Sequence, residues 1–164
     1  MKVLIAYKTK YGTTAACARF LAERIHAPTE LCDLAATRRV DVGSFDVVLI
    51  GGSIYGGKIQ RQVTSFCDQY RDFLLGRKVG VFLCCLYQGD HAVQQMKTAF
   101  PEWLLTHVFD TALPGGELHY DKLTLMDRLL VGALSHPRGD VSLLKTEVLE
   151  QMAAEVNALP AAIG

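Results

Sequence analysis

The most constraining feature of the sequence is its opening: the apolar run Val3–Tyr7, the turn Thr9–Thr14, and a helix pattern from Thr14 to about Ile25. The first backbone N–H groups of a helix have no partner within it, and the helix dipole adds about half a positive charge there. Threonine hydroxyls in the turn can donate to oxygen atoms, and Gly12 lets the backbone approach a ligand closely. The opening therefore predicts a βα unit with a site for a phosphorylated ligand at the helix N-terminus.

The same turn excludes several other phosphate-binding motifs. The sequence has no Gly-x-x-x-x-Gly-Lys-Ser/Thr string, which a P-loop requires. The turn has a single glycine, whereas a dinucleotide fingerprint has three. It also lacks the acidic residues that follow the first strand of a phosphorylated response regulator. An ordinary βα turn in which a hydroxyl caps the helix stays open as the alternative.

Composition limits the classes of partner. Seventeen Lys or Arg balance 17 Asp or Glu among 164 residues, which does not favour nucleic acid or an anionic membrane. No stretch reaches the roughly 18–20 apolar residues of a membrane span, and Met1 leads straight into a strand, so no signal peptide is expected. Five cysteines without a Cys-x-x-Cys argue against a disulfide framework and a zinc site. We expect one cytoplasmic domain over residues 1–164, with reduced thiols and no metal.

Strand and helix patterns alternate along the rest of the chain. Further strands are predicted near 30–32, 46–51, 79–86 and 108–113, and further helices near 63–74, 92–100, 123–134 and 144–156. The continuous apolar runs at 46–51 and 79–86 are typical of central parallel strands covered on both faces. Because parallel crossovers are right-handed, we predict a doubly wound α/β fold: a five-stranded parallel sheet of order 2-1-3-4-5 with helices on both faces.

Three loops should meet at the carboxyl edge of this sheet, where open α/β sheets bind ligands. They are Thr9–Thr14 after the first strand, Gly52–Lys58 after the third and Leu86–His91 after the fourth. The second and third of these loops each carry a tyrosine, Tyr55 or Tyr87, together with glycine. That combination suits a flat aromatic ring held between two loops.

On these residues the chain resembles the flavodoxin family, whose FMN-phosphate loop is similar to Thr9–Thr14 and whose flavin-flanking loops fall at Ser53–Lys58 and Tyr87–His91. The resemblance implies a flavodoxin-like fold, bound FMN, and a role in carrying electrons between a reductase and an acceptor. The cofactor-binding residues that it implies are Thr9, Lys10, Tyr11, Gly12, Thr13, Thr14, Ser53, Ile54, Tyr55, Gly56, Gly57, Leu86, Tyr87, Gln88, Gly89 and Asp90.

Within the implied site, we expect the hydroxyls of Thr9, Thr13 and Thr14 to hold the phosphate, with Lys10 either adding a charge or staying in solvent. The tyrosines of the other two loops should stack on the flavin, an interaction worth about 0.5–1.5 kcal/mol beyond burial. One of the two glycines after Tyr55 would let a peptide carbonyl turn toward the flavin. No catalytic residue is assigned.

Two segments, Gly51–Gly57 and Leu113–Arg128, narrow the resemblance to the flavodoxin-like branch that includes menaquinone-dependent protoporphyrinogen oxidase. That branch implies an alternative function, a quinone-linked flavoenzyme in place of an electron carrier. A third hypothesis is a flavodoxin-like fold that has lost its flavin and serves as a binding module. The redox partner is accordingly expected to be a protein or a quinone.

Two further patterns carry structural expectations. The apolar residues at 123–134 cover more than one face of a helix, which favours a helix packed in the core or in a homodimer seam. The alternative is a surface for a quinone, a porphyrinogen or a membrane interface. Cys84 and Cys85 are adjacent on a predicted strand, so their side chains should point to opposite faces as buried structural thiols.

Overall fold

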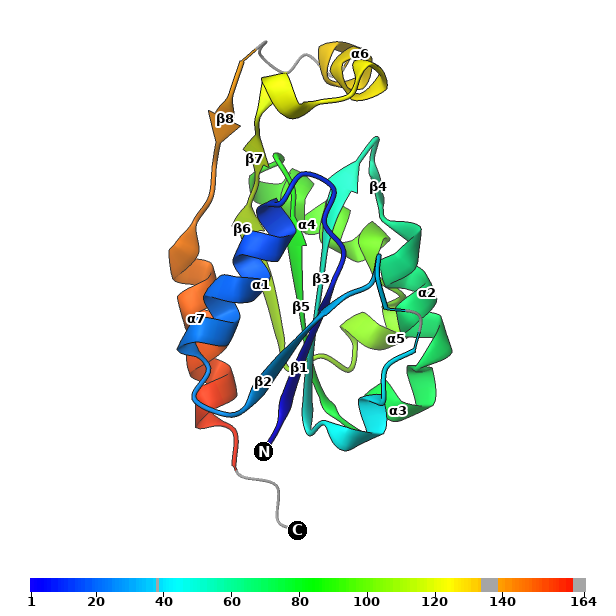
Figure 1. The fold of residues 1–164 in the computed structure, drawn as a ribbon, viewed down its shortest axis with the longest axis vertical. Helices are drawn as coiled ribbons and strands as arrows, with labels where there is room; N and C mark the ends of the chain where they lie inside the picture. The colour runs from blue at the N-terminus through cyan, green and yellow to red at the C-terminus, as the bar shows by residue number, and fades with distance from the viewer. Residues whose placement is uncertain (38, 134–138, 161–164) are drawn as a thin grey trace.

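A computed structural model describes residues 1–37, 39–133 and 139–160, and it has the predicted doubly wound α/β architecture (Figure 1). The central sheet contains five parallel strands, in the order β2-β1-β3-β5-β6. Their bounds are β2 Thr29–Asp33, β1 Val3–Tyr7, β3 Val47–Tyr55, β5 Lys78–Cys84 and β6 Asp110–Gly115. Counted along the chain, these parallel strands have the order 2-1-3-4-5, so the predicted topology is confirmed.

Helices cover both faces of the sheet, as predicted. One face is covered by α1 (Thr13–Arg24) and α7 (Thr146–Ala158). The other is covered by α2 (Arg61–Gln69), α3 (Arg71–Leu75), α4 (Gly89–Ala99) and α5 (Glu102–Leu105). On the inner side of α1, Cys17, Ala18 and Leu21 are buried, which fixes the helix against the sheet and aims its N-terminus at the carboxyl end of β1.

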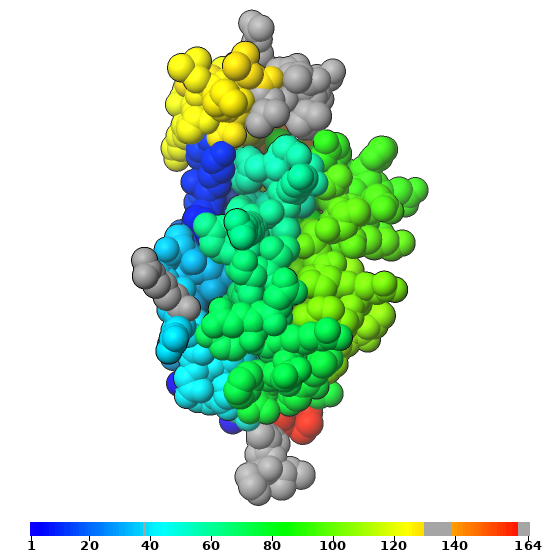
Figure 2. Space-filling model, turned by 90° about the vertical axis from the view of Figure 1, so that its right-hand side faces the viewer, coloured from blue at the N-terminus to red at the C-terminus, as the bar shows by residue number. Residues whose placement is uncertain are grey.

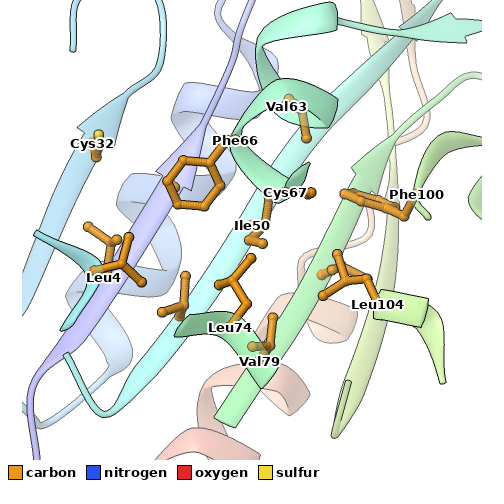
Figure 3. Close-up of a cluster of buried hydrophobic side chains, with 14 of the residues drawn as sticks. Leu4, Cys32, Ile50, Val63, Phe66, Cys67, Leu74, Val79, Phe100 and Leu104 are labelled. Atoms are coloured by element: carbon orange, nitrogen blue, oxygen red, sulfur yellow. The ribbon is translucent and has the colours of Figure 1, made fainter. Parts of the chain in front are cut away.

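The predicted single helix at 63–74 is wrong, because the chain bends between α2 and α3. Tyr70 leaves helical geometry at φ −107° and ψ 17°, and its hydroxyl accepts a hydrogen bond from the Val40 N–H at 2.9 Å. The bend turns Phe73 outward, with 53% of its surface exposed, while Leu74 stays fully buried. Figure 3 shows Leu74 on the same side of the sheet as the α2 residues, close to Ile50.

The third strand runs four residues further than predicted and ends in a hairpin. β3 continues through Tyr55 and pairs antiparallel with the two-residue β4 (Lys58–Ile59). The connecting residues Gly56 and Gly57 have φ values of 56° and 75°. A two-residue type I′ turn requires positive φ at both positions, which glycine adopts without strain. What the sequence pattern indicates as an open loop is therefore a tight hairpin.

An extension between β6 and α7 rises above the carboxyl edge of the sheet (Figure 1). Its base is an antiparallel ribbon of β7 (Glu117–Leu118) and β8 (Val141–Ser142), which the sequence pattern does not predict. The ribbon carries the helix α6 (Leu125–Ala133). Short 3-10 turns lie at Val42–Ser44 and Tyr120–Lys122.

The helix predicted at 123–134 is present as α6, but residue 134 lies outside the described residues. Leu125, Met126 and Leu129 are exposed over 81%, 71% and 69% of their surface, so the expectation that this face packs in the core is wrong. A homodimer through the same helix stays a prediction. Within the described ranges, no helix has the length and apolar character needed to cross a bilayer.

Candidate functional site

The turn after β1 leaves the N-terminus of α1 without a side-chain cap. Gly12 holds the N-cap position at φ 100°, and no side chain among the described residues makes a hydrogen bond that caps the helix. Thr9 Oγ1 accepts the Gly12 N–H at 2.9 Å, so this hydroxyl group shapes the turn itself. The alternative of an ordinary hydroxyl-capped helix is therefore wrong. The first N–H groups of α1 remain available to an anion.

The Thr14 hydroxyl is a second unsatisfied hydrogen-bonding group at the start of α1. Its side chain is 1% exposed, and its hydroxyl oxygen has no hydrogen-bond partner among the described residues. The Cys84 thiol, a weak hydrogen-bonding group, lies close enough for Thr14 to lower the pKa of Cys84 against larger opposing effects, but no contact between the two side chains meets hydrogen-bond geometry. Burying an unsatisfied hydroxyl costs about 1–3 kcal/mol. A phosphate oxygen at the N-terminus of α1 would satisfy it.

Helix α6 is tied to the same turn through Asp127, which is 6% exposed. The Lys10 ammonium lies 2.6 Å from Asp127 Oδ2, and the Tyr11 hydroxyl donates to the same oxygen. Thr124 Oγ1 donates to it as well, at 2.9 Å. We call these four residues the Asp127 clasp. Figure 2 shows the yellow residues of this region seated on the blue N-terminal segment.

The clasp determines which group compensates the positive charge of Lys10. Burial acts to raise the pKa of Asp127, but hydrogen bonds from Lys10, Tyr11 and Thr124 outweigh it and lower that pKa. Lys10 keeps 40% of its side-chain surface exposed and pairs with the Asp127 carboxylate, which compensates its charge; its role toward a phosphate stays a prediction. Sequence reasoning missed Asp127 and Thr124. The available signal was a single acidic residue within the apolar helix pattern.

A small cavity brings residues of all three predicted loops together. Its volume is about 40 Å³, well below the roughly 300–1,000 Å³ of common ligand pockets. Its lining contains Thr13, Ser53, Ile54, Tyr55, Cys84, Cys85, Leu86, Gly116, Glu117 and Leu118. The last three come from the extension, which narrows the space above the sheet. The three loops therefore meet as expected, but the side chains enclose little room.

The two predicted stacking tyrosines have different neighbours. Tyr55 packs edge-on against Tyr11, with ring centroids 5.5 Å apart, and its ring centroid is 5.1 Å from the Lys10 ammonium. Burial raises the pKa of Tyr55 well above its ordinary value. Tyr87 lies nearly parallel to His91, with centroids 6.3 Å apart. Tyr55 is thus joined to the phosphate turn, and Tyr87 to the start of α4.

The remaining predicted site residues lie at the ends of the same elements. Ser53 is held by Gln60, whose side-chain oxygen accepts the Ser53 N–H at 3.0 Å, a partner that the sequence analysis missed. The glycines of the hairpin turn have open space around them. Gln88 precedes α4, and Gly89 and Asp90 form its exposed first turn instead of a loop.

Two other features bear on the choice of site. A hollow of about 650 Å³ lies at the opposite edge of the sheet, beside Asp46, Arg77 and His107. It is far from the three loops, and ligands of open α/β sheets bind at the carboxyl edge. The described ranges contain no group of three or more His, Cys, Asp or Glu arranged to hold a metal ion. The carboxyl edge stays the candidate site.

The residues at the phosphate end fit the phosphate of FMN. The uncapped helix, the orphaned Thr14 hydroxyl and the positive φ of Gly12 form one cradle of donors, with nothing within 4 Å of a Cβ placed on Gly12. A phosphate dianion needs several donors of this kind in one place. The side chains at the ring end would have to move to admit the rest of the molecule.

Comparisons with known proteins agree with this architecture. Residues 4–142 match the family model described as "Flavodoxin domain". No curated protein matches the chain by sequence. The Streptococcus pneumoniae TIGR4 flavodoxin is 13% identical, with a TM-score of 0.58 and coverage of 96% of this chain and 99% of that one.

Two other solved structures are similar in fold. A flavoprotein from Lactobacillus acidophilus, solved in complex with FMN, is 19% identical over 68% of this chain and 92% of its own, with a TM-score of 0.52. The rubredoxin oxygen:oxidoreductase of Desulfovibrio gigas is 16% identical with a TM-score of 0.55; 96% of this chain aligns with it, but that spans only 37% of the larger protein.

Proposed function

The chain belongs to the flavodoxin domain family, and on that premise we propose that it binds FMN and carries electrons between redox partners. Flavin chemistry, when the cofactor is bound, comes from the isoalloxazine ring, and the protein supplies orientation and electrostatics. The observation that carries the proposal is the buried Thr14 hydroxyl without a hydrogen-bond partner at an uncapped helix N-terminus.

In this proposal the start of α1 holds the phosphate. The backbone N–H groups after Gly12 and the hydroxyls of Thr13 and Thr14 donate to its oxygens. Thr9 keeps the turn in shape through its bond with the Gly12 N–H. The Asp127 clasp sets the local charge, because it neutralises Lys10 beside the phosphate.

The ring end is assigned to the loops that line the small cavity. Tyr55 offers a ring face at the edge of β3, held in place by Tyr11. A peptide group at Gly56 or Gly57 has room to reorient, because the space around both glycines is open. Tyr87 and Asp90 would meet the ring from the β5 side, so a negative charge at Asp90 would disfavour added electrons.

A flavin titration tests the proposal. The visible spectrum of the purified protein is recorded before and after addition of FMN and removal of the excess. We expect flavin bands that persist, and a loss of FMN affinity of about 10- to 100-fold in Thr14→Val, since a hydrogen bond to a charged group contributes about 1.5–3 kcal/mol. The unliganded variant should be as stable as the parent or more so, because an orphaned hydroxyl is removed.

Two controls make the result specific to the phosphate. Riboflavin, which lacks the phosphate, should bind Thr14→Val and the parent protein equally well. Thr98→Val, an exposed change on α4, should leave FMN affinity unchanged. A protein that stays colourless after reconstitution, or an unaltered FMN affinity in Thr14→Val, would refute the assignment.

Electron carriage is tested separately from binding. We expect rapid reduction of the loaded protein by a ferredoxin reductase and no quinone-dependent oxidation of protoporphyrinogen. The reverse pattern would favour the quinone-linked flavoenzyme. That narrower resemblance gains no support from the matches above and stays a prediction.

A further inference from the structure

Two buried thiols from distant parts of the sequence face each other beneath the phosphate turn. Cys17 lies on the buried side of α1, and Cys84 is the last residue of β5. Their sulfur atoms are 3.7 Å apart, and the residues are 1% and 3% exposed. The two belong to the same core cluster, between the sheet and the α1–α7 layer. They are thus in direct contact although 67 positions separate them.

The other three cysteines have different surroundings. Cys85 Sγ donates to the Tyr87 carbonyl at 3.7 Å, and strand geometry sends it to the side opposite Cys84. Cys32 and Cys67 belong to the cluster on the other side of the sheet. Burial raises the pKa of Cys67 to about 12. These thiols serve as internal references for the reactivity of the pair.

The contact makes one thiol of the pair easier to ionise. A hydrogen bond with Cys84 lowers the pKa of Cys17, even though burial opposes this. The same bond and burial raise the pKa of Cys84, so Cys17 is the more readily ionised thiol of the pair. Thiolates, and not thiols, react with oxidants. Cys17 is therefore the nucleophile of the pair.

A small oxidant can approach this contact from the Cys84 side. Cys84 lines the 40 Å³ cavity at the carboxyl edge, next to Ser53 and Gly116. A cavity needs about 10–15 Å³ of this kind of volume to hold a water molecule. The cavity therefore has room beside Cys84 for a molecule as small as hydrogen peroxide.

We propose that Cys17 and Cys84 form a reversible disulfide when the protein meets hydrogen peroxide. Disulfide formation needs a sulfur–sulfur distance of about 2.05 Å, and the observed contact leaves only a short approach. The proposal is independent of any bound cofactor. It differs from the sequence prediction that Cys84 is an inert structural thiol.

The chemistry proceeds in two steps. The Cys17 thiolate attacks one oxygen of the peroxide, the O–O bond breaks, and Cys17 becomes a sulfenic acid as hydroxide leaves. The Cys84 sulfur then attacks the Cys17 sulfur, its proton joins the departing hydroxyl group, and water is released as the S–S bond forms. Two electrons pass from the thiol pair to the peroxide. A small dithiol reductant reverses the reaction by thiol–disulfide exchange.

Peptide mapping of the full chain provides the test. After peroxide treatment under native conditions, we expect the intact mass to fall by two hydrogens, and after alkylation and digestion we expect the tryptic peptides 11–19 and 79–97 to be joined. Cys85→Ala leaves Cys84 as the one cysteine of the second peptide and should retain the cross-link. Cys17→Ala should abolish it, and Cys67→Ala should not change it.

Thermal unfolding gives an independent readout. A bond that closes a loop of this length restricts the unfolded chain, so the oxidised protein should unfold at least about 5 °C higher than the reduced protein. Dithiothreitol should reverse the shift, and Cys17→Ala should not show it. A disulfide between Cys84 and Cys85, peroxide oxidation of isolated thiols, or no reaction of Cys17 would each overturn the proposal.

Discussion

The two ends of the candidate site differ in how complete they are. At the phosphate end, an uncapped helix, a glycine with positive φ and an unsatisfied hydroxyl already form a cradle. At the ring end, Tyr55, Leu86 and the ribbon residue Leu118 leave a cavity of only about 40 Å³. The difference follows from what builds each end. Backbone geometry fixes the helix N-terminus, whereas side chains from three separate segments fill the ring end.

This contrast predicts that charge controls the phosphate end and packing controls the ring end. The Asp127 clasp brings one cation and one anion next to the phosphate cradle, so single substitutions there change the local charge by one unit. Substitutions at Tyr55 change the shape of the cavity without changing its charge. Flavin analogues with and without a phosphate separate the two effects.

Among substitutions in the clasp, the largest effect is expected from Lys10→Met. The change leaves the Asp127 carboxylate uncompensated beside the bound phosphate, and repulsion of about 1.4 kcal/mol would weaken FMN binding about tenfold. Fluorescence titrations at low and high salt measure it, and added salt should reduce the loss. Lys97→Met, an exposed change in the last turn of α4, is the matched control. Equal affinities for FMN in Lys10→Met and the parent would place the clasp outside the electrostatic reach of the phosphate.

The ring end should respond to Tyr55→Ala. Loss of a stacked ring removes about 0.5–1.5 kcal/mol, so riboflavin affinity should fall about 2- to 12-fold. Competition by inorganic phosphate should be unchanged, because the cradle around Gly12 is intact. Tyr55→Phe keeps the ring and should retain most of the affinity. Tighter riboflavin binding in Tyr55→Ala would mean that Tyr55 closes the site instead of stacking in it.

The sequence predicts the phosphate end better than the ring end for the same physical reason. A βα turn with Gly12 is a local feature, and the strand order follows from general rules of connection, so both can be deduced from pattern alone. The hairpin at Gly56–Gly57 is also encoded locally, in two consecutive glycines, but two consecutive glycines equally fit the open loop that the sequence analysis predicts. Its length depends on pairing between β3 and β4, which neighbouring residues do not reveal.

Contacts between distant segments are what the sequence analysis could not supply. Asp127 contacts Tyr11, which lies 116 positions earlier in the chain, and Cys84 of β5 contacts Cys17 of α1. Neither pair has a spacing signature, because each depends on how α6 or β5 lies in the finished fold. The apolar pattern of α6 likewise did not show that Leu125 and Met126 face solvent, since the ribbon carries that helix away from the core.

A smaller effect of opposite sign is expected from Asp127→Asn. The change leaves the Lys10 charge uncompensated, so FMN affinity should rise about threefold at low salt, an effect that salt screening reduces. The double variant, Lys10→Met with Asp127→Asn, restores the net charge of the clasp and should bind FMN within about twofold of the parent. A double-mutant cycle of FMN titrations measures the coupling. Weaker FMN binding in Asp127→Asn would show that the clasp acts by positioning Tyr11 instead of by charge.

The smallest effect is a difference in the pH dependence of unfolding between two aspartates. The pKa of Asp127 is lowered by the hydrogen bonds of the clasp, which outweigh burial. Its contribution to stability is therefore present above the ordinary carboxyl pKa of about 3.9 and is lost as the pH falls through the lower folded value. The free energies of unfolding of the parent and Asp127→Asn, measured by urea titration, should differ at pH 7 by at most about 1 kcal/mol, and that difference should shrink below about pH 4.

Asp110 supplies the matched control because its shift has the other sign. Burial raises the pKa of Asp110, helped by the charge of Glu155 and opposed by a hydrogen bond from the Thr111 N–H. The folded protein then holds the Asp110 proton more tightly than the unfolded chain does. Its stabilising effect is complete in acid and is lost as the pH rises through the raised value. Relative to the parent, Asp127→Asn should lose stability as the pH rises toward about 3.9, whereas Asp110→Asn should gain stability as the pH rises above that value and through the raised pKa of Asp110. Parallel curves for the two variants would show that the clasp carboxylate is not held in its charged form by Lys10, Tyr11 and Thr124.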